Sequence, residues 1–376
     1  MIVLASQYRF PEGDAGSVRQ YGFASTLTKL GYDVFVIGNG KRLNFVKVYK
    51  GIRYGSLRGK NKYFSRITFA FRIINKLKKL KKDNPIEAIL VGSVDLPVLC
   101  LIKCFCKKHN IKLLKDAVEW FSPCEFKYGK LSITYIEKNI ENKYIIDKSV
   151  HVISISQYLD NYFKLKGIKS VRVPIYMEQS PFQKRNYDSN KLVITYAGSP
   201  GKKDYLHTIL NTLAMLPAEE KSKILFNIIG VDTEGVKKII NHDVYASIEN
   251  NIKVFGRITR ENVLKILDKT DFTVLLRPET ERYAMAGFPT KVIESISASV
   301  PVIMNMTSDL NLYFKDRYNC ITVKDCSEAS LLSAFEYALS LSSEEKMQIS
   351  KNAKELAFEH FNIMSYADKL QKIITE

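Results

Sequence analysis

Residues 277–301 read RPETERYAMAGFPTKVIESISASVP and lie between two short apolar runs, at 272–276 and 302–304. A β-branched run, a loop with glycine and proline, a helix of about two turns and a second strand make a β-loop-α-β unit. Pro289 fits the first turn of a helix and cannot continue a strand, so we expect the helix to begin near Thr290. The stretch therefore predicts an α/β fold.

The N-terminus of this expected helix has the groups that bind a diphosphate. Its first backbone N–H groups lack a partner within the helix, the helix dipole is positive there, and Thr290 and Lys291 stand beside it. Glu294 lies one turn further along, where its carboxylate can reach a sugar hydroxyl such as that of a ribose. The alternative is an ordinary amphipathic helix that packs on a sheet through Val292, Ile293 and Ile296.

Residues 287–303, GFPTKVIESISASVPVI, resemble the donor-binding segment of retaining GT-B glycosyltransferases, specifically glycosyltransferase family 4. That family carries two glutamates separated by seven residues, with a Gly-Phe pair after the first. Glu294 matches the second glutamate, which holds the nucleotide ribose in the family, whereas Ala286 occupies the first position and has no carboxylate. The resemblance implies that the donor is bound by Gly287, Phe288, Pro289, Thr290, Lys291 and Glu294.

The bulk composition fits two ordinary domains. The chain has 376 residues, of which 46% are hydrophobic, so each domain can bury a core of its own. No uninterrupted apolar run approaches the roughly 18 residues of a membrane-spanning helix. The chain enters the strand MIVLAS without a basic region or cleavage site, which predicts a cytoplasmic protein. The six cysteines form no CxxC pair, so we expect reduced thiols rather than a disulfide framework or a zinc site.

The charge is strongly basic. Lysine and arginine number 57 against 39 aspartates and glutamates, a formal net charge of +18 that favours a polyanionic or membrane-surface partner. No arginine-rich tail, zinc finger or RNP-like aromatic segment favours nucleic acid. Residues 65–82, SRITFAFRIINKLKKLKK, put apolar side chains at helical spacing among lysines, and such a helix can lie on an anionic bilayer. The alternative is a surface helix whose apolar stripe faces its own sheet.

The first strand, expected at 2–6, leads into a polar loop with glycines and a helix that we expect Ser17 to cap. This order opens a doubly wound fold, although the loop lacks the GxGxxG dinucleotide fingerprint. A turn alone explains the glycines equally well. In family 4 the matching loop lies near the donor phosphates, and the resemblance makes donor-binding candidates of Gly13, Gly16 and Arg19.

The segment KDAVEWFSP, residues 115–123, follows a predicted strand at 112–115. Open α/β sheets bind ligands at the carboxyl ends of strands. A D-x-x-E-W segment looks like a subset of family 4 enzymes that assemble bacterial surface polysaccharides, many of which have a histidine facing the donor sugar. This chain has none there, so Glu119 is the catalytic candidate, because a carboxylate can face a developing oxocarbenium ion or accept the acceptor's proton. The alternative is a structural cap of the following loop.

The polar run at 177–190 is the expected linker, after which LVITYA at 192–197 restarts the α/β pattern. The loop GSPGKKD (198–204) joins this strand to a helix, where lysines and open N–H groups can bind phosphate or, alternatively, are only solvated. In the family an arginine and a lysine grip the donor diphosphate here. Lys203 matches the lysine, whereas Ser199 stands at the arginine position, which Lys202, Arg257 or Arg277 can replace. The resemblance adds Gly198, Ser199, Lys203 and Arg257 to the donor-binding residues, and makes Lys203 and Lys291 catalytic candidates.

The whole pattern predicts an α/β protein with the GT-B fold, in which two Rossmann-like domains face each other across a cleft. We place the N-terminal acceptor-side domain at 1–178 and the C-terminal nucleotide-sugar-binding domain at 191–355. The resemblance implies that residues 356–376 form a C-terminal helix that packs back on the N-terminal domain. Ser342 and Glu345 make a capping box for a helix before it.

The leading hypothesis is a retaining, metal-independent glycosyltransferase that moves a sugar from a nucleotide-diphosphate sugar, with a UDP-sugar expected, to a lipid-linked or saccharide acceptor. Helix-tip and lysine donors neutralise the leaving diphosphate, so we expect neither a cofactor nor a metal. Such an enzyme acts in cell-surface polysaccharide synthesis, in the cytoplasm and peripherally at the anionic inner face of the cell membrane. The alternatives are a GT-B sugar-nucleotide epimerase, which needs no acceptor, and, from the charge alone, a nucleic-acid-binding protein.

Overall fold

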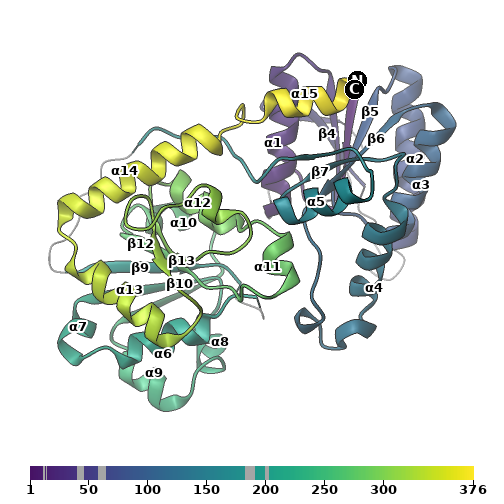
Figure 1. Ribbon diagram of the computed structural model, residues 1–376. Coiled ribbons are helices and arrows are strands. Elements are labelled where there is room, and N and C mark those ends of the chain that lie inside the picture. The colour runs from purple at the N-terminus through teal and green to yellow at the C-terminus, as the bar shows by residue number, and fades with distance from the viewer. Residues whose placement is uncertain (12, 14, 40–45, 58–64, 183–190, 200–202) are drawn as a thin grey trace. The chain divides into compact units, whose positions relative to one another are not determined.

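The computed structural model describes residues 1–11, 13, 15–39, 46–57, 65–182, 191–199 and 203–376, without the side chains of 65–67. The chain divides into two compact units, each an α/β unit around a parallel sheet (Figure 1). Unit 1 comprises Met1–Glu178, Ala286–Phe288 and Asn362–Glu376, and unit 2 comprises Gln179–Met285 and Pro289–Phe361. The predicted α/β class with two parallel-sheet units is confirmed.

Unit 1 is built on a sheet whose described strands run in the order β3-β4-β2-β1-β5-β6-β7-β8. Neighbouring strands are parallel, except that the edge strand β3 pairs antiparallel with β4. The order reverses between β1 and β5, which is the switch point of a doubly wound sheet. The strands β1, β2 and β5 are buried along their whole length, because helices cover both faces. The strands are β1 (Ile2–Ala5), β2 (Val34–Gly38), β3 (Lys47–Tyr49), β4 (Ile52–Ser56), β5 (Ala88–Val91), β6 (Lys112–Ala117), β7 (His151–Ser154) and β8 (Ser170–Arg172).

The C-terminal helix α15 belongs to unit 1, where it packs on α1 and β8 (Figure 1). Leu370 and Ile373 join the core of this unit, and the Thr26 hydroxyl donates to the Ile363 carbonyl at 2.7 Å. The helices of unit 1 are α1 (Ala15–Lys29), α2 (Ser65–Asp83), α3 (Leu96–His109), η1 (Pro123–Glu125), η2 (Gly129–Leu131), α4 (Ile133–Ile140), the π-helical η3 (Glu141–Ile145), α5 (Gln157–Leu165) and α15 (Ala367–Thr375).

Unit 2 has a wholly parallel sheet, in the order β11-β10-β9-β12-β13-β14 for the described strands. Its switch point lies between β9 and β12. The strands are β9 (Leu192–Ala197), β10 (Ile224–Ile229), β11 (Ile252–Gly256), β12 (Phe272–Leu275), β13 (Val302–Asn305) and β14 (Ile321–Val323).

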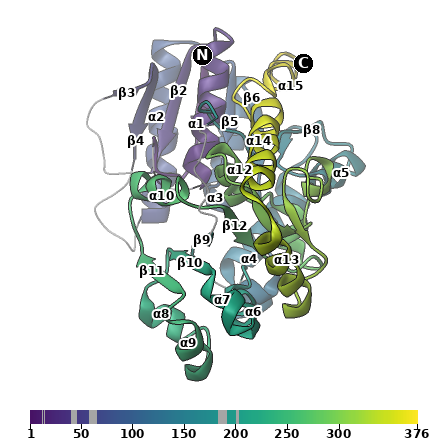
Figure 2. The ribbon, with the colours of Figure 1, turned by 90° about the vertical axis from the view of Figure 1, so that its left-hand side faces the viewer.

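The helices of unit 2 lie on both faces of this sheet, and α12 contacts the long helix α14 (Figure 2). They are α6 (Leu206–Met215), α7 (Ala218–Ser222), α8 (Thr233–Lys237), α9 (His242–Ile248), α10 (Arg260–Leu267), α11 (Arg282–Ala286), α12 (Thr290–Ser297), η4 (Leu310–Leu312), α13 (Glu328–Ser340) and α14 (Ser343–His360).

Most of the expected elements form where the sequence places them. The helix α12 begins at Thr290, and Ser342 and Glu345 make the expected capping box at the start of α14. The expectation that Ser17 caps α1 is wrong, because the helix begins at Ala15 and Ser17 lies buried inside its first turn. Residues 183–190 of the expected linker lie outside the described residues. Unit 2 continues to Phe361, so only residues from Asn362 onward return to unit 1.

The helix α2 turns its apolar stripe inward, since Ala70, Ile73 and Leu77 are buried. This agrees with the alternative in which the stripe faces its own sheet. Lys78, Lys79, Lys81 and Lys82 face solvent, whereas Lys76 is half-buried over the Phe35 ring of β2. None of the helices in the described part of the chain is long and apolar enough to span a membrane.

Candidate functional site

The candidate site of unit 2 lies at the carboxyl ends of β9 and β12, the two strands that flank the switch point. Gly198 follows β9 and Arg277 follows β12, while α12 begins with Thr290 and Lys291 on the next connection. Open α/β sheets bind their ligands in this position, because the loops on either side of a switch point diverge and leave room.

The carboxylate of Asp204 is the centre of this site and is 2% exposed. Arg277 donates from Nε to Oδ1 at 3.0 Å, and the Lys291 ammonium forms an ion pair with Oδ2. The Tyr196 hydroxyl donates to Oδ2 at 2.9 Å. The buried carboxylate of Asp204 thus binds two cations, Arg277 after β12 and Lys291 in α12. With one negative and two positive charges, these three side chains together carry one net positive charge.

The surroundings of these groups shift their pKa values. Burial acts to raise the pKa of Asp204, but the charges of Lys291 and Arg277 outweigh it and hold the pKa below its ordinary value. Burial lowers the pKa of Lys291, an effect that the Asp204 carboxylate opposes. Burial also raises the pKa of Tyr196, so this residue acts as a neutral hydrogen-bond donor. The ion pairs therefore fix Asp204 in its charged form.

Asn305, at the end of β13, fixes the backbone of Arg277. Its Oδ1 accepts from the Arg277 N–H at 2.9 Å and its Nδ2 donates to the Arg277 carbonyl at 2.7 Å. The same Nδ2 donates to Glu279 at 3.1 Å. Hydrogen bonds to both the N–H and the carbonyl of Arg277 hold its guanidinium toward Asp204. Asn305 was not among the residues predicted from the sequence, although it directly follows the apolar run at 302–304.

The two cations of the cluster remain reachable from solvent. The side chain of Lys291 is 27% exposed and that of Arg277 is 16% exposed. Charged donors held in place by a carboxylate do not have to be ordered when an anion binds, which lowers the entropic cost of binding. The arrangement therefore suits a multiply charged anion such as a diphosphate.

The N-terminus of α12 adds backbone donors beside Lys291. Its N-cap is Pro289, which has no side chain able to accept a hydrogen bond, so the first-turn N–H groups lack a cap. Glu294 lies one turn along the same helix. Burial raises the pKa of its carboxyl, although the charges of Arg260 and Lys291 oppose this rise. Thr290 and Glu294 are half-buried.

The remaining expected donor-binding residues are Lys203, Ser199 and Arg257 in unit 2, and Gly287 and Phe288 in unit 1. The Lys203 ammonium lies 5.6 Å from the centre of the Tyr283 ring, whose hydroxyl donates to the Lys203 carbonyl at 3.2 Å. Ser199 and Arg257 are exposed after β9 and β11. Lys202 lies outside the described residues. Just before α12, Gly287 is half-buried and Phe288 is buried.

Arg19, expected near the donor, is buried in unit 1. Its Nε and Nη2 donate to Asp116 at 2.8–3.0 Å, and its Nη1 and Nη2 donate to the carbonyls of Pro174 and Val173. The residue is 2% exposed. These bonds join α1, β6 and the chain that follows β8, which gives Arg19 a packing role in the unit.

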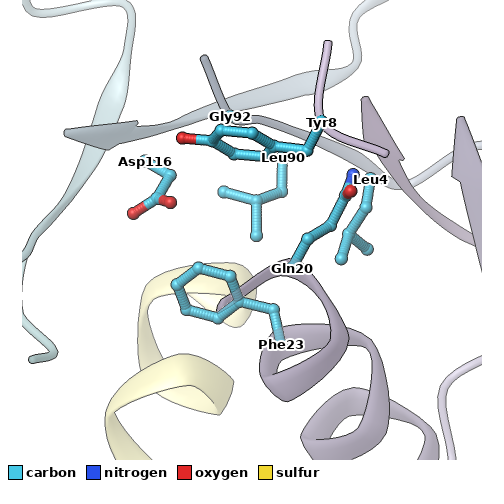
Figure 3. Close-up of a pocket in the computed structure, with 7 residues that line it drawn as sticks. All are labelled: Leu4, Tyr8, Gln20, Phe23, Leu90, Gly92 and Asp116. Carbon is cyan, nitrogen blue, oxygen red and sulfur yellow. The ribbon is translucent and has the colours of Figure 1, made fainter. Parts of the chain in front are cut away.

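The expected glycines of the first loop make room for aromatic and aliphatic side chains. A Cβ on Gly16 would overlap the Tyr8 ring, and one on Gly13 would lie 2.7 Å from the Cβ of Arg9. Tyr8 borders a small hollow at the switch point of unit 1 with room for about one water molecule (Figure 3). Gln20 and Asp116 face each other across it, and Gln20 Oε1 is buried without a hydrogen-bond partner.

Glu119 lies in the loop after β6, half-buried, next to the buried Trp120. The Trp120 indole donates to Asn139 at 3.1 Å and packs edge-on against Tyr162. The structure thus places Glu119 in unit 1 and the cationic cluster in unit 2. Among the described residues, no group of three or more His, Cys, Asp or Glu is arranged to hold a metal ion.

Residues 178–356 match the protein family described as Glycosyl transferases group 1. No curated protein matches the chain. Solved structures of similar fold include sucrose-phosphate synthase from Thermosynechococcus elongatus, with 16% identity, a TM-score of 0.76 and coverage of 100% of this chain and 98% of that chain. WaaG, a glycosyltransferase involved in lipopolysaccharide biosynthesis, shows 16% identity and a TM-score of 0.67, covering 100% of both chains. Anabaena HepE, in complex with UDP and glucose, shows 13% identity and a TM-score of 0.68, covering 100% of this chain and 99% of that chain.

The solved structures show that the chain has the GT-B fold, and residues 178–356 match a glycosyltransferase domain, as the resemblance in sequence predicts. Residues 178–356 are the Glycosyl transferases group 1 domain of the chain. The cluster around Asp204 and the N-terminus of α12 lie within this domain.

Proposed function

We propose that this protein is a retaining, metal-independent glycosyltransferase that moves a sugar from a UDP-sugar to a lipid-linked or saccharide acceptor in cell-surface polysaccharide synthesis. The observation that carries the proposal is the pair of cations, Lys291 and Arg277, held on Asp204 beside the uncapped N-terminus of α12. These groups lie at the switch point of a parallel sheet, within a glycosyltransferase domain.

The donor diphosphate binds to these groups, and its charge grows as the glycosidic bond breaks. Lys291, Arg277 and the first N–H groups of α12 stabilise that charge, with Lys203 as a further cation. Preorganised donors in a partly dry site act more strongly on a transition state than donors in water. Arg277 thereby takes the role of the arginine that Ser199 replaces, in preference to the exposed Arg257.

The nucleoside lies along α12, where the carboxylate of Glu294 accepts hydrogen bonds from the ribose hydroxyls. Gly287 and Phe288, which precede α12 in the chain, are the proposed contacts of the sugar, and Glu119 is the proposed catalytic carboxylate. UDP is the proposed nucleotide because HepE, which shares the fold, has been solved with UDP and with UDP-glucose.

The acceptor side belongs to unit 1 and to the cytoplasmic leaflet. WaaG, with the same fold, is involved in lipopolysaccharide biosynthesis. The net charge of +18 supports a peripheral association with an anionic inner leaflet, where a lipid-linked acceptor is found.

Isothermal calorimetry with UDP, GDP, ADP and CMP tests the donor assignment on the purified chain. We expect UDP to bind more tightly than the others, and to raise the unfolding free energy by about 2.7 kcal/mol at a hundredfold excess over its dissociation constant. The absence of binding by every nucleoside diphosphate would refute the proposal.

A sugar-nucleotide epimerase is the alternative within the same fold. An epimerase releases free nucleotide from a UDP-sugar without an acceptor, whereas a transferase requires one. Incubation with UDP-glucose, with and without a lipid-linked saccharide extract, separates the two, because only the transferase shows acceptor-dependent release of UDP.

A further inference from the structure

The helical segment that runs from η2 through α4 to η3 is inverted, with polar side chains inside and apolar ones outside. Lys138, Glu141 and Asn142 are its buried polar residues. Its large apolar side chains are exposed, and α4 lies in the lower part of unit 1 in the view of Figure 1. Soluble proteins normally turn the apolar face of a surface helix toward their core, so this arrangement leaves an apolar face without a partner in unit 1.

The outer apolar face consists of five large side chains within 17 consecutive residues. Ile133, Ile136 and Tyr144 share one side of the helical segment, with the half-buried Ile140 between them at helical spacing. The exposed fractions are 70% for Tyr128, 81% for Leu131, 65% for Ile133, 42% for Ile136 and 73% for Tyr144.

A buried ion network fixes this orientation. Lys138 donates to Glu141 at 2.8 Å, and Lys115 lies 3.4 Å from the same carboxylate. Lys115 also donates to the Gly92 carbonyl at 2.7 Å. Rotation of the helix would move Lys138 and Glu141 away from Lys115 and leave the buried Lys115 without its carboxylate. The apolar face therefore cannot turn inward without loss of stability.

The rim of the outer apolar face is basic. Lys127, Lys130 and Lys143 are exposed around it. Of the acidic side chains in this stretch, Glu125 accepts from the Ser122 N–H, Asp147 pairs with Lys103, and Glu137 is half-buried. Tyrosine and aliphatic side chains surrounded by lysines match the interface of a bilayer with anionic headgroups.

We propose that the outer apolar face is the surface by which unit 1 docks on an anionic lipid bilayer. Leu131, Ile133 and Tyr144 enter the boundary between headgroups and acyl chains, while the three rim lysines contact the headgroups. The inference rests on the proposed association with an anionic leaflet and gives it a defined contact surface. It replaces α2 in this role, because Phe71 is the one exposed large apolar residue among the described side chains of α2, and the apolar stripe of α2 is buried.

A second copy of the chain fits this face less well. In a two-fold symmetric contact the same patch meets itself, so the rim lysines of both copies would approach one another. Like charges brought together in an interface oppose association, whereas an anionic surface complements them. The charge around the face therefore favours lipid.

Sedimentation of the full chain with vesicles tests the proposal, using phosphatidylcholine alone and phosphatidylcholine mixed with phosphatidylglycerol. We expect binding to the mixed vesicles at low salt, and its loss at about 0.5 M salt. Combined Leu131→Ser, Ile133→Ser and Tyr144→Ser should weaken binding at least about tenfold. Serine at Lys127, Lys130 and Lys143 should weaken it on the order of a hundredfold.

Two control variants test whether any exposed apolar side chain, or any group of surface lysines, would give the same effect on vesicle binding. Leu165→Ser removes an apolar side chain of α5 that is 89% exposed, and serine at Lys78, Lys79 and Lys82 removes charge from α2. Both controls should change vesicle binding by less than about twofold. Loss of binding in the α2 variant, or unchanged binding in the two variants of the outer apolar face, would overturn the assignment.

A depth measurement gives an independent result. A tryptophan introduced by Leu131→Trp should be quenched by brominated acyl chains, whereas one introduced by Leu165→Trp should not. If neither tryptophan is quenched, or if both are quenched equally, the outer apolar face does not insert into the bilayer. The assignment is also wrong if the chain forms a dimer without lipid and the combined Leu131, Ile133 and Tyr144 variant dissociates that dimer. UDP affinity in the same samples reports on unit 2, so failure of the proposed donor site is distinguishable from failure of lipid docking.

Discussion

The ammonium group of Lys291 lies against Gly198, in the space that a side chain at position 198 would fill. A Cβ on Gly198 would overlap Cε and Nζ of Lys291. Gly198 also has φ +150, a backbone conformation that other residues rarely adopt. The glycine at the end of β9 therefore allows Lys291 to reach Asp204.

Gly198→Ala should displace Lys291 and weaken UDP binding by at least about tenfold, or about 1.4 kcal/mol. Gly256→Ala is the matched control, because Gly256 has φ +63 but no atom within 4 Å of an added Cβ. It tests backbone strain without overlap, and its UDP affinity should stay close to that of the unmodified chain. Calorimetry measures both, and equal losses in the two variants would show that strain alone is responsible.

Arg277→Ala should reduce the affinity for UDP but not for UMP, since the guanidinium is assigned to the diphosphate. Removal of a charge-assisted contact that strengthens in the transition state should also cost about 2–4 kcal/mol in kcat/KM. Arg257→Ala removes the exposed arginine that the sequence equally allowed. If Arg257→Ala is the more damaging substitution, the assignment of the second cation to Arg277 is wrong.

The sequence predicted the helix at Thr290 and the alternation of strands and helices, because prolines, glycines and apolar periodicity act locally. It did not predict that Asp204 would bind both Lys291 and Arg277, which are 87 and 73 residues away in the chain. Such a meeting depends on which strands become neighbours, and local patterns do not encode strand order. Polar residues at strand ends, such as Asn305, were the available signal.

The expected cap at Ser17 and the hairpin of β3 and β4 show the same limit on a smaller scale. The hairpin turns at Lys50 and Gly51, both with positive φ, which suits a tight two-residue connection. Its short strands carry little apolar periodicity, so no strand was predicted there from the sequence. The inverted helix at Ile133 was equally hidden, since apolar spacing shows that a face exists and not which way it turns.

Asp204→Asn should lower the free energy of unfolding at neutral pH, because the carboxylate is stabilised by two cations in the folded state. The pKa of Asp204 is depressed on folding, so its contribution is present above the unfolded pKa of about 3.9 and is lost as pH falls through the folded value. Urea unfolding of both proteins at pH 7 and in acid checks this. The difference between them should shrink in acid, and a difference independent of pH would contradict the charged state assigned to Asp204.

Lys203→Ala and Lys291→Ala should each impair turnover far more than folding, at a cost of about 2–4 kcal/mol in the transition state. Lys291→Ala should in addition destabilise the fold by about 1 kcal/mol, because the buried Asp204 loses one partner but keeps Arg277 and Tyr196. Acceptor-dependent UDP release measures turnover, and urea unfolding measures stability. Normal turnover in both variants would show that neither lysine binds the donor diphosphate.

Glu294→Gln should weaken UDP binding by about 1 kcal/mol at slightly alkaline pH, since a carboxylate accepts ribose hydroxyl bonds more strongly than an amide does. Burial raises the pKa of Glu294, so the carboxylate form is lost at a higher pH than in an exposed glutamate. UDP affinity of the unmodified chain should therefore fall as pH is lowered toward that pKa, while the glutamine variant lacks this change. Titration of the UDP phosphate affects both proteins equally, so it cancels in the ratio of the dissociation constant of the glutamine variant to that of the unmodified chain. Calorimetry from about pH 8 to pH 5 should show that ratio approaching one in acid, and a constant ratio would remove Glu294 from the ribose site.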